Sequence, residues 1–288
     1  MDKPLITIAQ ALSWARELFS AHQVSDDGKH DSAAIDSKVL LAACLEREVV
    51  YLHTWPEKLL DEPQVKTFQN YITKRSLGHP VAHIIGYRDF WSLRLNVSPA
   101  TLIPRPETEL LVEIALTLDV SAHSKVLDLG TGSGAIALAL ASENPNWSIT
   151  GLDKSSEAVV LAKENALIHK LERVDFIKSD WFSAVKNERF HLIVTNPPYI
   201  EDNNQYLQQG DVRFEPKSAL TSGLDGLDDI RLIVSQSKNH LIANGWLLIE
   251  HGYQQNIQVK DILKSHGFKQ IRSELDLNGL PRVTLGYI

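Results

Sequence analysis

The segment 125–142 combines a short apolar strand, a glycine-rich loop and a helix in immediate succession. Val126-Leu127-Asp128-Leu129 predicts the strand, which runs directly into the loop Gly130-Thr131-Gly132-Ser133-Gly134. Residues 135–142 then predict a helix. This succession is the first unit of a nucleotide-binding sheet, because glycines turn tightly and let a ligand lie against bare backbone. No lysine follows the last glycine, so the loop is not a phosphate-gripping P-loop.

The alternation of strands and helices continues to the end of the chain. Apolar runs predict strands at 147–152, 174–178, 191–195 and 246–250, and helical spacing predicts helices at 156–169, 228–241 and 257–266. A closing pair, 269–275 and 282–287, is joined through Asn278-Gly279. The pattern predicts an α/β fold with a doubly wound, Rossmann-like sheet, mostly parallel, whose last strand is antiparallel.

The residues before this sheet show a different pattern. To residue 76 they predict helices only, the first opened by a capping box at Thr7 and Gln10 and another beginning at Thr54-Trp55-Pro56-Glu57. Their apolar stripes need partners, so we expect a small helical bundle over 1–76. Residues 77–105 predict a hairpin or linker, and 106–288 form the sheet domain.

Two acids follow the second and third strands of the sheet. Asp153 lies 21 residues after Gly132, the spacing at which an acid bridges the ribose hydroxyls of an adenosine ligand, although it could instead begin the next helix. Asp180 could accept from an adenine amino group while Trp181 covers the ring. The alternative is a surface acid beside a partly buried tryptophan.

Asn196-Pro197-Pro198-Tyr199 follows the fourth strand, 191–195. The prolines hold the backbone extended and lack N–H groups, so the segment is rich in hydrogen-bond acceptors. With the Asn196 oxygen and the Tyr199 ring it forms a rigid cup for a planar –NH2 group. A plain turn is the alternative, since Asn-Pro and Pro-Pro are common in turns. The glycine loop, Asp153, Asp180 and Asn196 all end successive strands, so we expect them around one crevice.

Four segments together resemble the peptide chain release factor N5-glutamine methyltransferases, within the class I S-adenosylmethionine-dependent methyltransferases. They are Ile103-Pro104-Arg105-Pro106-Glu107-Thr108, residues 128–134, Asn196-Pro197-Pro198-Tyr199-Ile200 and Arg213-Phe214-Glu215-Pro216. The resemblance covers essentially the whole chain. It implies methylation of the glutamine side-chain nitrogen in the Gly-Gly-Gln motif of class 1 release factors. It also implies that the N-terminal helices bind the release factor.

The resemblance and the strand-end positions together give the expected site. The cofactor is S-adenosylmethionine, with S-adenosylhomocysteine as product, bound by Gly130, Thr131, Gly132, Ser133, Gly134, Asp153, Asp180, Trp181 and Asn196. The substrate amide is bound by Asn196, Pro197, Pro198 and Tyr199, of which Asn196, Pro197 and Tyr199 are catalytic. Arg105 and Glu107 either border the substrate mouth or form a surface ion pair at a helix start. We expect His251 to be structural.

Three other functions share parts of this pattern. An adenine-N6 methyltransferase acting on DNA or RNA would also use an Asn-Pro-Pro-Tyr cup, but the net charge of −7 argues against a protein that grips phosphates. An oxidoreductase, or a binding module without catalysis, would leave the cup unexplained. Cys44 is the one cysteine and no apolar stretch is long enough to span a bilayer, so we expect a cytoplasmic monomer without a metal.

Overall fold

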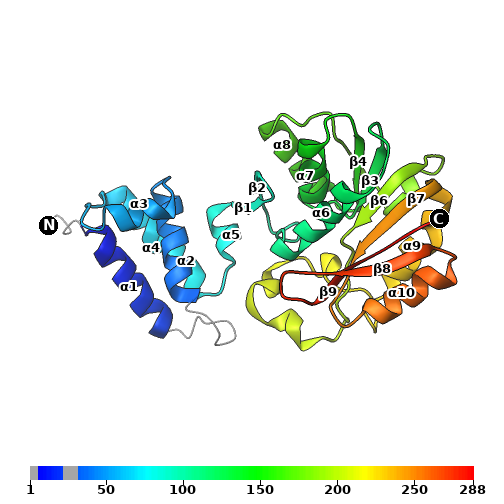
Figure 1. Ribbon diagram of the computed structural model, residues 1–288. Helices are drawn as coiled ribbons and strands as arrows, with labels where there is room; N and C mark the ends of the chain where they lie inside the picture. The colour runs from blue at the N-terminus through cyan, green and yellow to red at the C-terminus, as the bar shows by residue number, and fades with distance from the viewer. Residues whose placement is uncertain (1–5, 22–31) are drawn as a thin grey trace. The chain divides into compact units, whose positions relative to one another are not determined.

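The described residues of the chain fall into two groups, each with its own internal contacts. The computed structural model describes residues 6–21 and 32–288. The helical unit holds the described residues up to Gly86 together with Tyr206–Phe214, and the sheet unit holds Tyr87–Gln205 with Glu215–Ile288. The helices of the first unit are α1 (Ile8–Ala21), α2 (Ser32–Cys44), α3 (Val49–Thr54), α4 (Glu62–Ser76) and α5 (Val81–Ile85) (Figure 1).

The all-helical character predicted for the N-terminal region is confirmed, as is the first capping box. The Thr7 amide donates to Gln10 Oε1 over 2.8 Å, and the Gln10 amide donates to Thr7 Oγ1 over 3.2 Å. The helix that follows buries Ile8 and Phe19 in the core of the unit. Two backbone donors that a helix start leaves without partners are therefore satisfied by side chains.

The helix start predicted at Thr54 is wrong. Helix α3 ends at Thr54, and α4 begins at Glu62. Trp55 leaves the helical region, with φ −128° and ψ 55°. The stronger start signal lies at Asp61, whose side chain accepts from the Gln64 amide over 2.8 Å while Gln64 returns the bond over 3.0 Å.

A segment from late in the chain completes the helical unit. Tyr206–Phe214 lies in sequence between two parts of the sheet unit, yet it packs within the helical unit. Arg75 is 8% exposed, and its guanidinium binds Asp36 over 2.7 Å and Asp211 over 3.0 Å. The Phe214 ring lies 4.5 Å from that of His79, measured between centroids. This arrangement could not be expected from the local patterns of the sequence.

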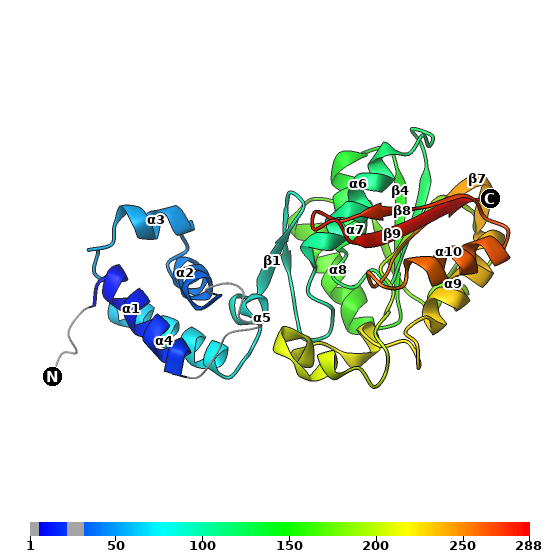
Figure 2. The same cartoon turned by 60° about the horizontal axis from the view of Figure 1, so that its bottom comes forward.

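The sheet of the second unit has seven strands in the order β5-β4-β3-β6-β7-β9-β8. Strands β3 to β7 pair in parallel, and β9 pairs antiparallel with both β7 and β8. Figure 2 shows β8 and β9, the closing pair of the chain, side by side. The predicted sheet with an antiparallel last strand is thus confirmed. The strands are β3 (Lys125–Leu129), β4 (Ser148–Asp153), β5 (Asp175–Lys178), β6 (Phe190–Thr195), β7 (Leu241–Glu250), β8 (Lys269–Leu275) and β9 (Pro281–Tyr287).

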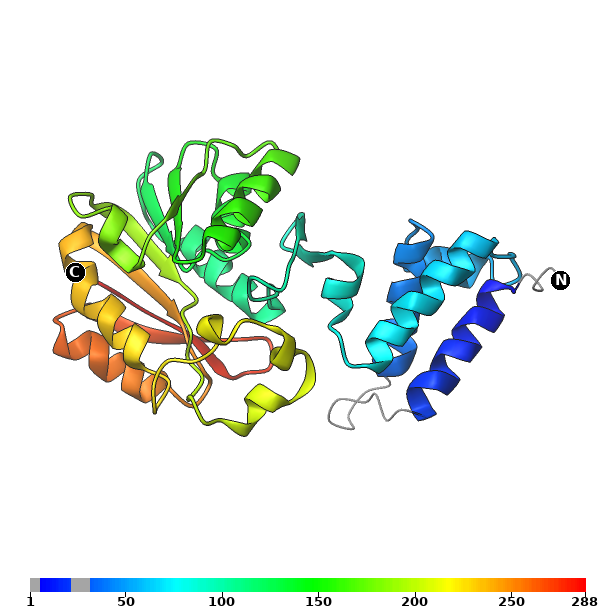
Figure 3. The ribbon, with the colours of Figure 1, turned by 180° about the vertical axis from the view of Figure 1, so that it is seen from behind.

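Both faces of this sheet are apolar and both are covered by helices (Figures 1 and 3). Successive side chains of a strand point to opposite faces, so Val126 packs in one cluster and Leu127 in the other. The first cluster contains α6 (Glu109–Thr117), α7 (Ala135–Glu143) and α8 (Ser156–Ile168), and the second α9 (Asp228–His240) and α10 (Asn256–Ser265). No helix formed by residues 6–21 and 32–288 is long and apolar enough to cross a membrane.

The strand register brings four carboxyl ends to the same edge of the sheet. Leu129 is paired with both Leu152 and Thr195, and Thr195 is paired with Ile249. The chain leaves β3 toward β4 on one side and places β6 on the other, so the strand order reverses at β3. Ligands of open α/β sheets bind outside the strand ends at such a switch point.

A hairpin of β1 (Tyr87–Phe90) and β2 (Leu93–Asn96), predicted from the sequence, precedes the sheet. It is tied to the strand-end edge by one buried amide. Asn165 Nδ2 of α8 donates to the Asn96 carbonyl over 3.1 Å and to the Ser133 carbonyl over 2.9 Å. The end of the hairpin and the glycine loop are therefore held by the same side chain.

Candidate functional site

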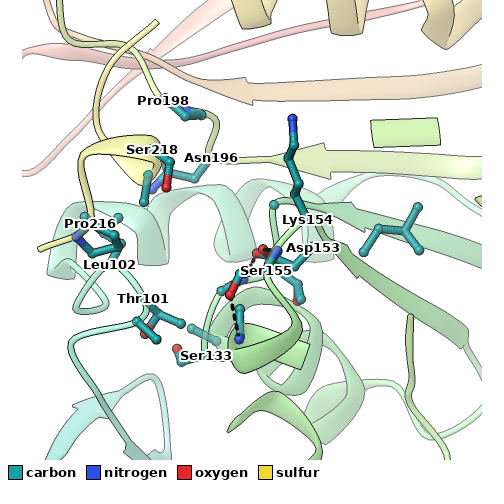
Figure 4. Close-up of a pocket in the computed structure, with 18 of the residues that line it drawn as sticks. Thr101, Leu102, Ser133, Asp153, Lys154, Ser155, Asn196, Pro198, Pro216 and Ser218 are labelled. Carbon is teal, nitrogen blue, oxygen red and sulfur yellow. Dashed lines mark hydrogen bonds between the residues drawn. The ribbon is translucent and has the colours of Figure 1, made fainter. Parts of the chain in front are cut away.

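A cavity of about 590 Å³ lies at the strand-end edge of the sheet unit. Its lining includes Gly130, Thr131, Gly132, Ser133, Asp153, Asp180, Trp181, Asn196 and Pro198, so most of the predicted site residues meet there. Figure 4 shows Ser133, Asp153, Asn196 and Pro198 around it, with Thr101, Leu102 and Pro216 on a further wall. The described residues that line it do not include Gly134, Pro197 or Tyr199.

The glycine loop presents bare backbone to this cavity. Gly132 has φ +56°, which favours glycine, and a Cβ built on it would meet no atom within 4 Å. The amides of Gly130 and Thr131 both donate to the Leu152 carbonyl over 2.9 Å. The loop after β3 is thus fixed to the end of β4 while Gly132 faces open space.

Asp128, in β3, binds the glycine loop and the start of α7, a role that was not predicted from the sequence. It is fully buried, and its Oδ2 accepts from Thr131 Oγ1 over 2.6 Å and from the Ala137 amide over 3.2 Å. Burial raises the pKa of Asp128 to about 7. The signal that could have revealed it is one acid in an otherwise apolar strand, since a buried acid needs hydrogen-bond partners.

Asp153 also binds the glycine loop. Its Oδ2 accepts from the Gly132 amide over 2.9 Å, and its Oδ1 accepts from the Ser155 amide over 2.8 Å. The cap of α8 is Ser155, whose side chain accepts from the Ala158 amide, and not Asp153. Burial raises the pKa of Asp153, although three backbone amides oppose that rise. Asp153 therefore places a carboxylate on the cavity wall beside the loop.

Asp180 and Trp181 form the next part of the wall. The Asp180 side chain is 60% exposed and pairs with Lys154 over 3.3 Å, so the surface position weighed in the sequence is present as well. Trp181 has φ +47°, a backbone conformation that non-glycine residues rarely adopt. A Cβ built on Gly130 would lie 3.8 Å from its ring. A strained backbone thus holds an indole against the glycine loop at the cavity.

The Asn196 segment adjoins the same loop. A Cβ built on Gly130 would lie 3.9 Å from the Asn196 main-chain oxygen. The Asn196 side chain donates from Nδ2 to Thr108 Oγ1 over 3.1 Å, which leaves its amide oxygen as an acceptor. The Asn196 segment and the glycine loop are therefore neighbours around one space, and the cup for an –NH2 group stays a prediction.

Tyr199 lies behind this cup. Its ring packs on the apolar cluster that contains Phe182 and Ile193, and its carbonyl accepts from Gln255 Nε2 over 3.0 Å. Burial and the nearby Glu250 carboxylate raise the pKa of the Tyr199 hydroxyl. The expected stacking of this ring on a substrate stays a prediction.

The opposite wall joins two of the segments that carried the sequence resemblance. Arg105 Nη2 lies 2.8 Å and 2.7 Å from the two carboxylate oxygens of Glu215. The Glu215 side chain is fully buried, whereas that of Arg105 is 28% exposed. Arg105 lines the cavity, so it is both an ion-pair partner and a wall residue.

His251 lies beside the site without lining the cavity. It is fully buried, its Nδ1 donates to the Gly252 carbonyl over 2.9 Å, and its Nε2 lies 2.7 Å from Thr284 Oγ1. Burial lowers the pKa of His251 to about 4, so the ring is neutral near pH 7. Both nitrogens are engaged in the fold, in agreement with the structural role expected for it.

Comparisons with known proteins match this architecture along the chain. Residues 106–214 match the model of the methyltransferase small domain, and residues 10–86 match that of the PrmC N-terminal domain. A release factor glutamine methyltransferase of Pseudomonas aeruginosa is 51% identical over 255 residues, 88% of this chain and 92% of that protein. One of Shewanella oneidensis is 48% identical over 279 residues, 97% of this chain and 95% of that protein.

A solved structure supports the fold. The crystal structure of a methyltransferase from Pyrococcus furiosus has a TM-score of 0.52 at 15% identity, and the match covers 76% of this chain and 96% of that one. At this identity the likeness concerns the architecture alone. The sheet and its flanking helices are therefore those of a methyltransferase fold.

Proposed function

The chain belongs to the family of release factor glutamine methyltransferases, and from that membership we propose that it methylates the side-chain amide nitrogen (N5) of a glutamine in a class 1 peptide chain release factor. The glutamine is that of the Gly-Gly-Gln motif, and the methyl donor is S-adenosylmethionine. One observation carries the proposal: Asn196 and the glycine loop line the same cavity.

The residues of the cavity fit the proposed cofactor. A volume of about 590 Å³ suits a ligand of nucleoside size. Asp153 would hold the ribose hydroxyls, Asp180 and Trp181 the adenine, and the backbone at Gly130 and Gly132 the amino acid part. Bound there, S-adenosylmethionine supplies an electrophilic methyl group on a positively charged sulfur and leaves as S-adenosylhomocysteine.

The Asn196 segment acts on the substrate nitrogen. An amide nitrogen is a poor nucleophile because its lone pair is delocalised into the carbonyl group. The Asn196 side-chain oxygen and the Pro197 carbonyl accept hydrogen bonds from the two N–H groups of the substrate amide. These bonds draw electron density toward the amide nitrogen and aim the nitrogen at the methyl group. A new N–CH3 bond forms as the S–CH3 bond breaks, and the nitrogen then loses one proton to water. Orientation at near-attack distance supplies most of the rate enhancement.

The helical unit has its own part in this proposal. Its match to the PrmC N-terminal domain supports the assignment of residues 1–76 to binding of the release factor. Residues 1–5 and 22–31 of that range lie outside the described residues. A release factor as partner and a single cysteine are consistent with the reducing cytoplasm. The monomeric state stays a prediction.

One labelling experiment tests the proposed function against an adenine-N6 methyltransferase. The full chain is incubated with methyl-labelled S-adenosylmethionine and, separately, with a class 1 release factor, duplex DNA and ribosomal RNA. We expect label on the release factor, at the glutamine of Gly-Gly-Gln when the protein is digested and sequenced by mass spectrometry. Label on a nucleic acid and none on the release factor would overturn the proposal.

A further inference from the structure

Thr108 lies between Asn196, the residue proposed to bind the substrate amide, and the buried acid Glu250. Asn196 Nδ2 donates to Thr108 Oγ1 over 3.1 Å, and Thr108 is 4% exposed. Glu250, at the end of β7, is 1% exposed. The pairing of Thr195 with Ile249 brings it to the same strand-end edge as Asn196. Burial raises the pKa of Glu250, and the hydroxyl of Thr108 opposes that rise. Glu250 Oε2 has no hydrogen-bond partner among the described residues. The loop after β6, the start of α6 and the end of β7 thus contribute one side chain each to a buried polar cluster.

The chemistry of these groups gives each hydrogen bond a direction. An ionised carboxylate only accepts, so Thr108 can interact with Glu250 only by donating its single hydroxyl proton. The Thr108 oxygen is then left as an acceptor, which selects the –NH2 end of the Asn196 side chain as its donor. The oxygen of Asn196 is consequently the end that remains for a ligand, and a substrate –NH2 group needs an acceptor there.

We propose that Thr108 and Glu250 are positioning residues, which fix the Asn196 amide with its oxygen toward the substrate nitrogen. This inference rests on the proposed function, in which Asn196 accepts an N–H bond of the target glutamine. Thr108 lines the cavity and Glu250 does not, and both act on the substrate through Asn196. They keep the –NH2 end of the Asn196 side chain turned away from the substrate –NH2 group. Two donor groups facing each other would be unfavourable.

The charge of Glu250 decides the direction of these hydrogen bonds. A protonated Glu250 could donate to Thr108, Thr108 could then donate to the Asn196 oxygen, and the amide would turn its –NH2 end to the substrate. The charged and titratable groups that interact with Glu250 are Tyr199 of the loop after β6, Arg282 of β9, and Arg105 and Glu107, which precede Thr108 in the sequence. Burial raises the pKa of Glu250 to about 7, so its titration falls within the range of an activity assay.

The test compares Thr108→Val with Thr108→Ser in the full chain. The turnover number and KM for the release factor are measured with labelled S-adenosylmethionine, and the affinity for S-adenosylmethionine is measured by calorimetry. We expect Thr108→Val to lower kcat on the order of 10- to 100-fold, as for a misplaced catalytic group. Thr108→Ser restores most of the rate, and both variants bind S-adenosylmethionine like the wild type. Thr117→Val on α6, which removes an exposed hydroxyl bonded to the Ile114 carbonyl, serves as control.

Two results would overturn the positioning role: Thr108→Val at the wild-type rate, or a loss of cofactor affinity as large as the loss of rate. Glu250→Gln decides independently where Thr108→Val does not fold. We expect the rate of the wild type to fall as the pH is lowered and Glu250 is protonated. This fall should be absent in Glu250→Gln and present in Glu113→Gln, a control at an exposed position. If Glu250→Gln shows the same fall of rate at low pH as the wild type, the positioning role of Glu250 is refuted. A wild type that labels no release factor refutes the proposed function instead.

Discussion

The main-chain amide of Gly132 donates a hydrogen bond to the carboxylate of Asp153 over 2.9 Å. This bond joins the loop after β3 to the end of β4, and the second Asp153 oxygen accepts from the Ser155 amide over 2.8 Å. One carboxylate therefore fixes the geometry of the loop and also lines the cavity. Loop shape and ligand contact are coupled at this residue.

Replacing Asp153 by Asn should weaken cofactor binding. The substitution removes a charge that accepts hydrogen bonds from the loop and, in the proposed complex, from the ribose. Hydrogen bonds to charged groups contribute about 1.5–3 kcal/mol, so we expect affinity for S-adenosylmethionine to fall about 10- to 100-fold. Calorimetric titration measures it, with the exposed Asp175→Asn as control. Equal affinities for Asp153→Asn and wild type would show that Asp153 serves the loop alone.

Replacing Asn196 by Ala should separate methyl transfer from cofactor binding. The change removes the acceptor aimed at the substrate nitrogen, and loss of one such preorganised group typically costs on the order of 100- to 1000-fold in rate. The glycine loop is untouched, so S-adenosylmethionine should still bind. Labelled transfer to a release factor and calorimetry give the two readouts, with Asn187→Ala on an exposed loop as control. An equal loss of both would assign Asn196 mainly to the cofactor.

The sheet and half of the site follow from local patterns. Strands β3 to β7 alternate with helices along the sequence, and that alternation is typical of a doubly wound sheet. The glycine loop, Asp153, Asp180 and Asn196 were found because strand ends of a parallel sheet share one edge. These inferences needed no knowledge of contacts between distant residues.

The remaining parts of the site depend on such contacts. Arg105 meets Glu215 across 110 positions, and Thr108 meets Asn196 across 88. Sequence spacing gives no measure of these distances, so Arg105 could equally have been a surface residue. The packing of Tyr206–Phe214 within the helical unit was missed for the same reason. Helix signals fail similarly at Thr54, where the capping box at Asp61 gives the stronger start.

Asp128 should make stability depend on pH. Its pKa rises from 3.8 to about 7 on folding, because burial disfavours the charged form. The folded chain therefore binds this proton more tightly, and the stability it adds is full below pH 3.8 and is lost as pH rises through about 7. Glu250 contributes in the same direction, from 4.5 to about 7. The free energy of unfolding should fall between pH 5 and pH 8 by amounts on the order of kcal/mol.

Asp128→Asn isolates that contribution. The asparagine keeps an oxygen for Thr131 and Ala137 but places an –NH2 group where Asp128 Oδ1 has no hydrogen-bond partner among the described residues. We expect the variant to be less stable than wild type at pH 5, and the difference to shrink at pH 8 because only the wild type has to bury a charge. Urea unfolding at both pH values measures this. An unchanged pH slope would contradict the role given to Asp128.

The ion pair of Arg105 and Glu215 should stabilise the sheet unit more than an exposed pair does. Arg105→Gln removes the guanidinium that binds both oxygens of a fully buried carboxylate, and we expect unfolding to require about 2 kcal/mol less. This lies below the range for fully buried pairs because more than a quarter of the Arg105 side chain is exposed. Asp89→Asn breaks a 2.9 Å pair with Arg94 whose members are both more than half exposed, and should change stability by at most about 0.5 kcal/mol. Equal effects would mean that burial of Glu215 adds nothing.

Asp211→Asn should loosen the segment Tyr206–Phe214. Asp211 lies 3.0 Å from the Arg75 guanidinium, which also binds Asp36 over 2.7 Å, so the variant keeps the second pair and loses the first. Hydrogen–deuterium exchange should therefore quicken over residues 206–214 and stay unchanged in α2, which carries Asp36. Glu201→Gln, an exposed position in the same loop, is the matched control. If exchange over 206–214 is the same in Asp211→Asn and in the control, the packing of Phe214 on His79 holds the segment and the ion pair does not.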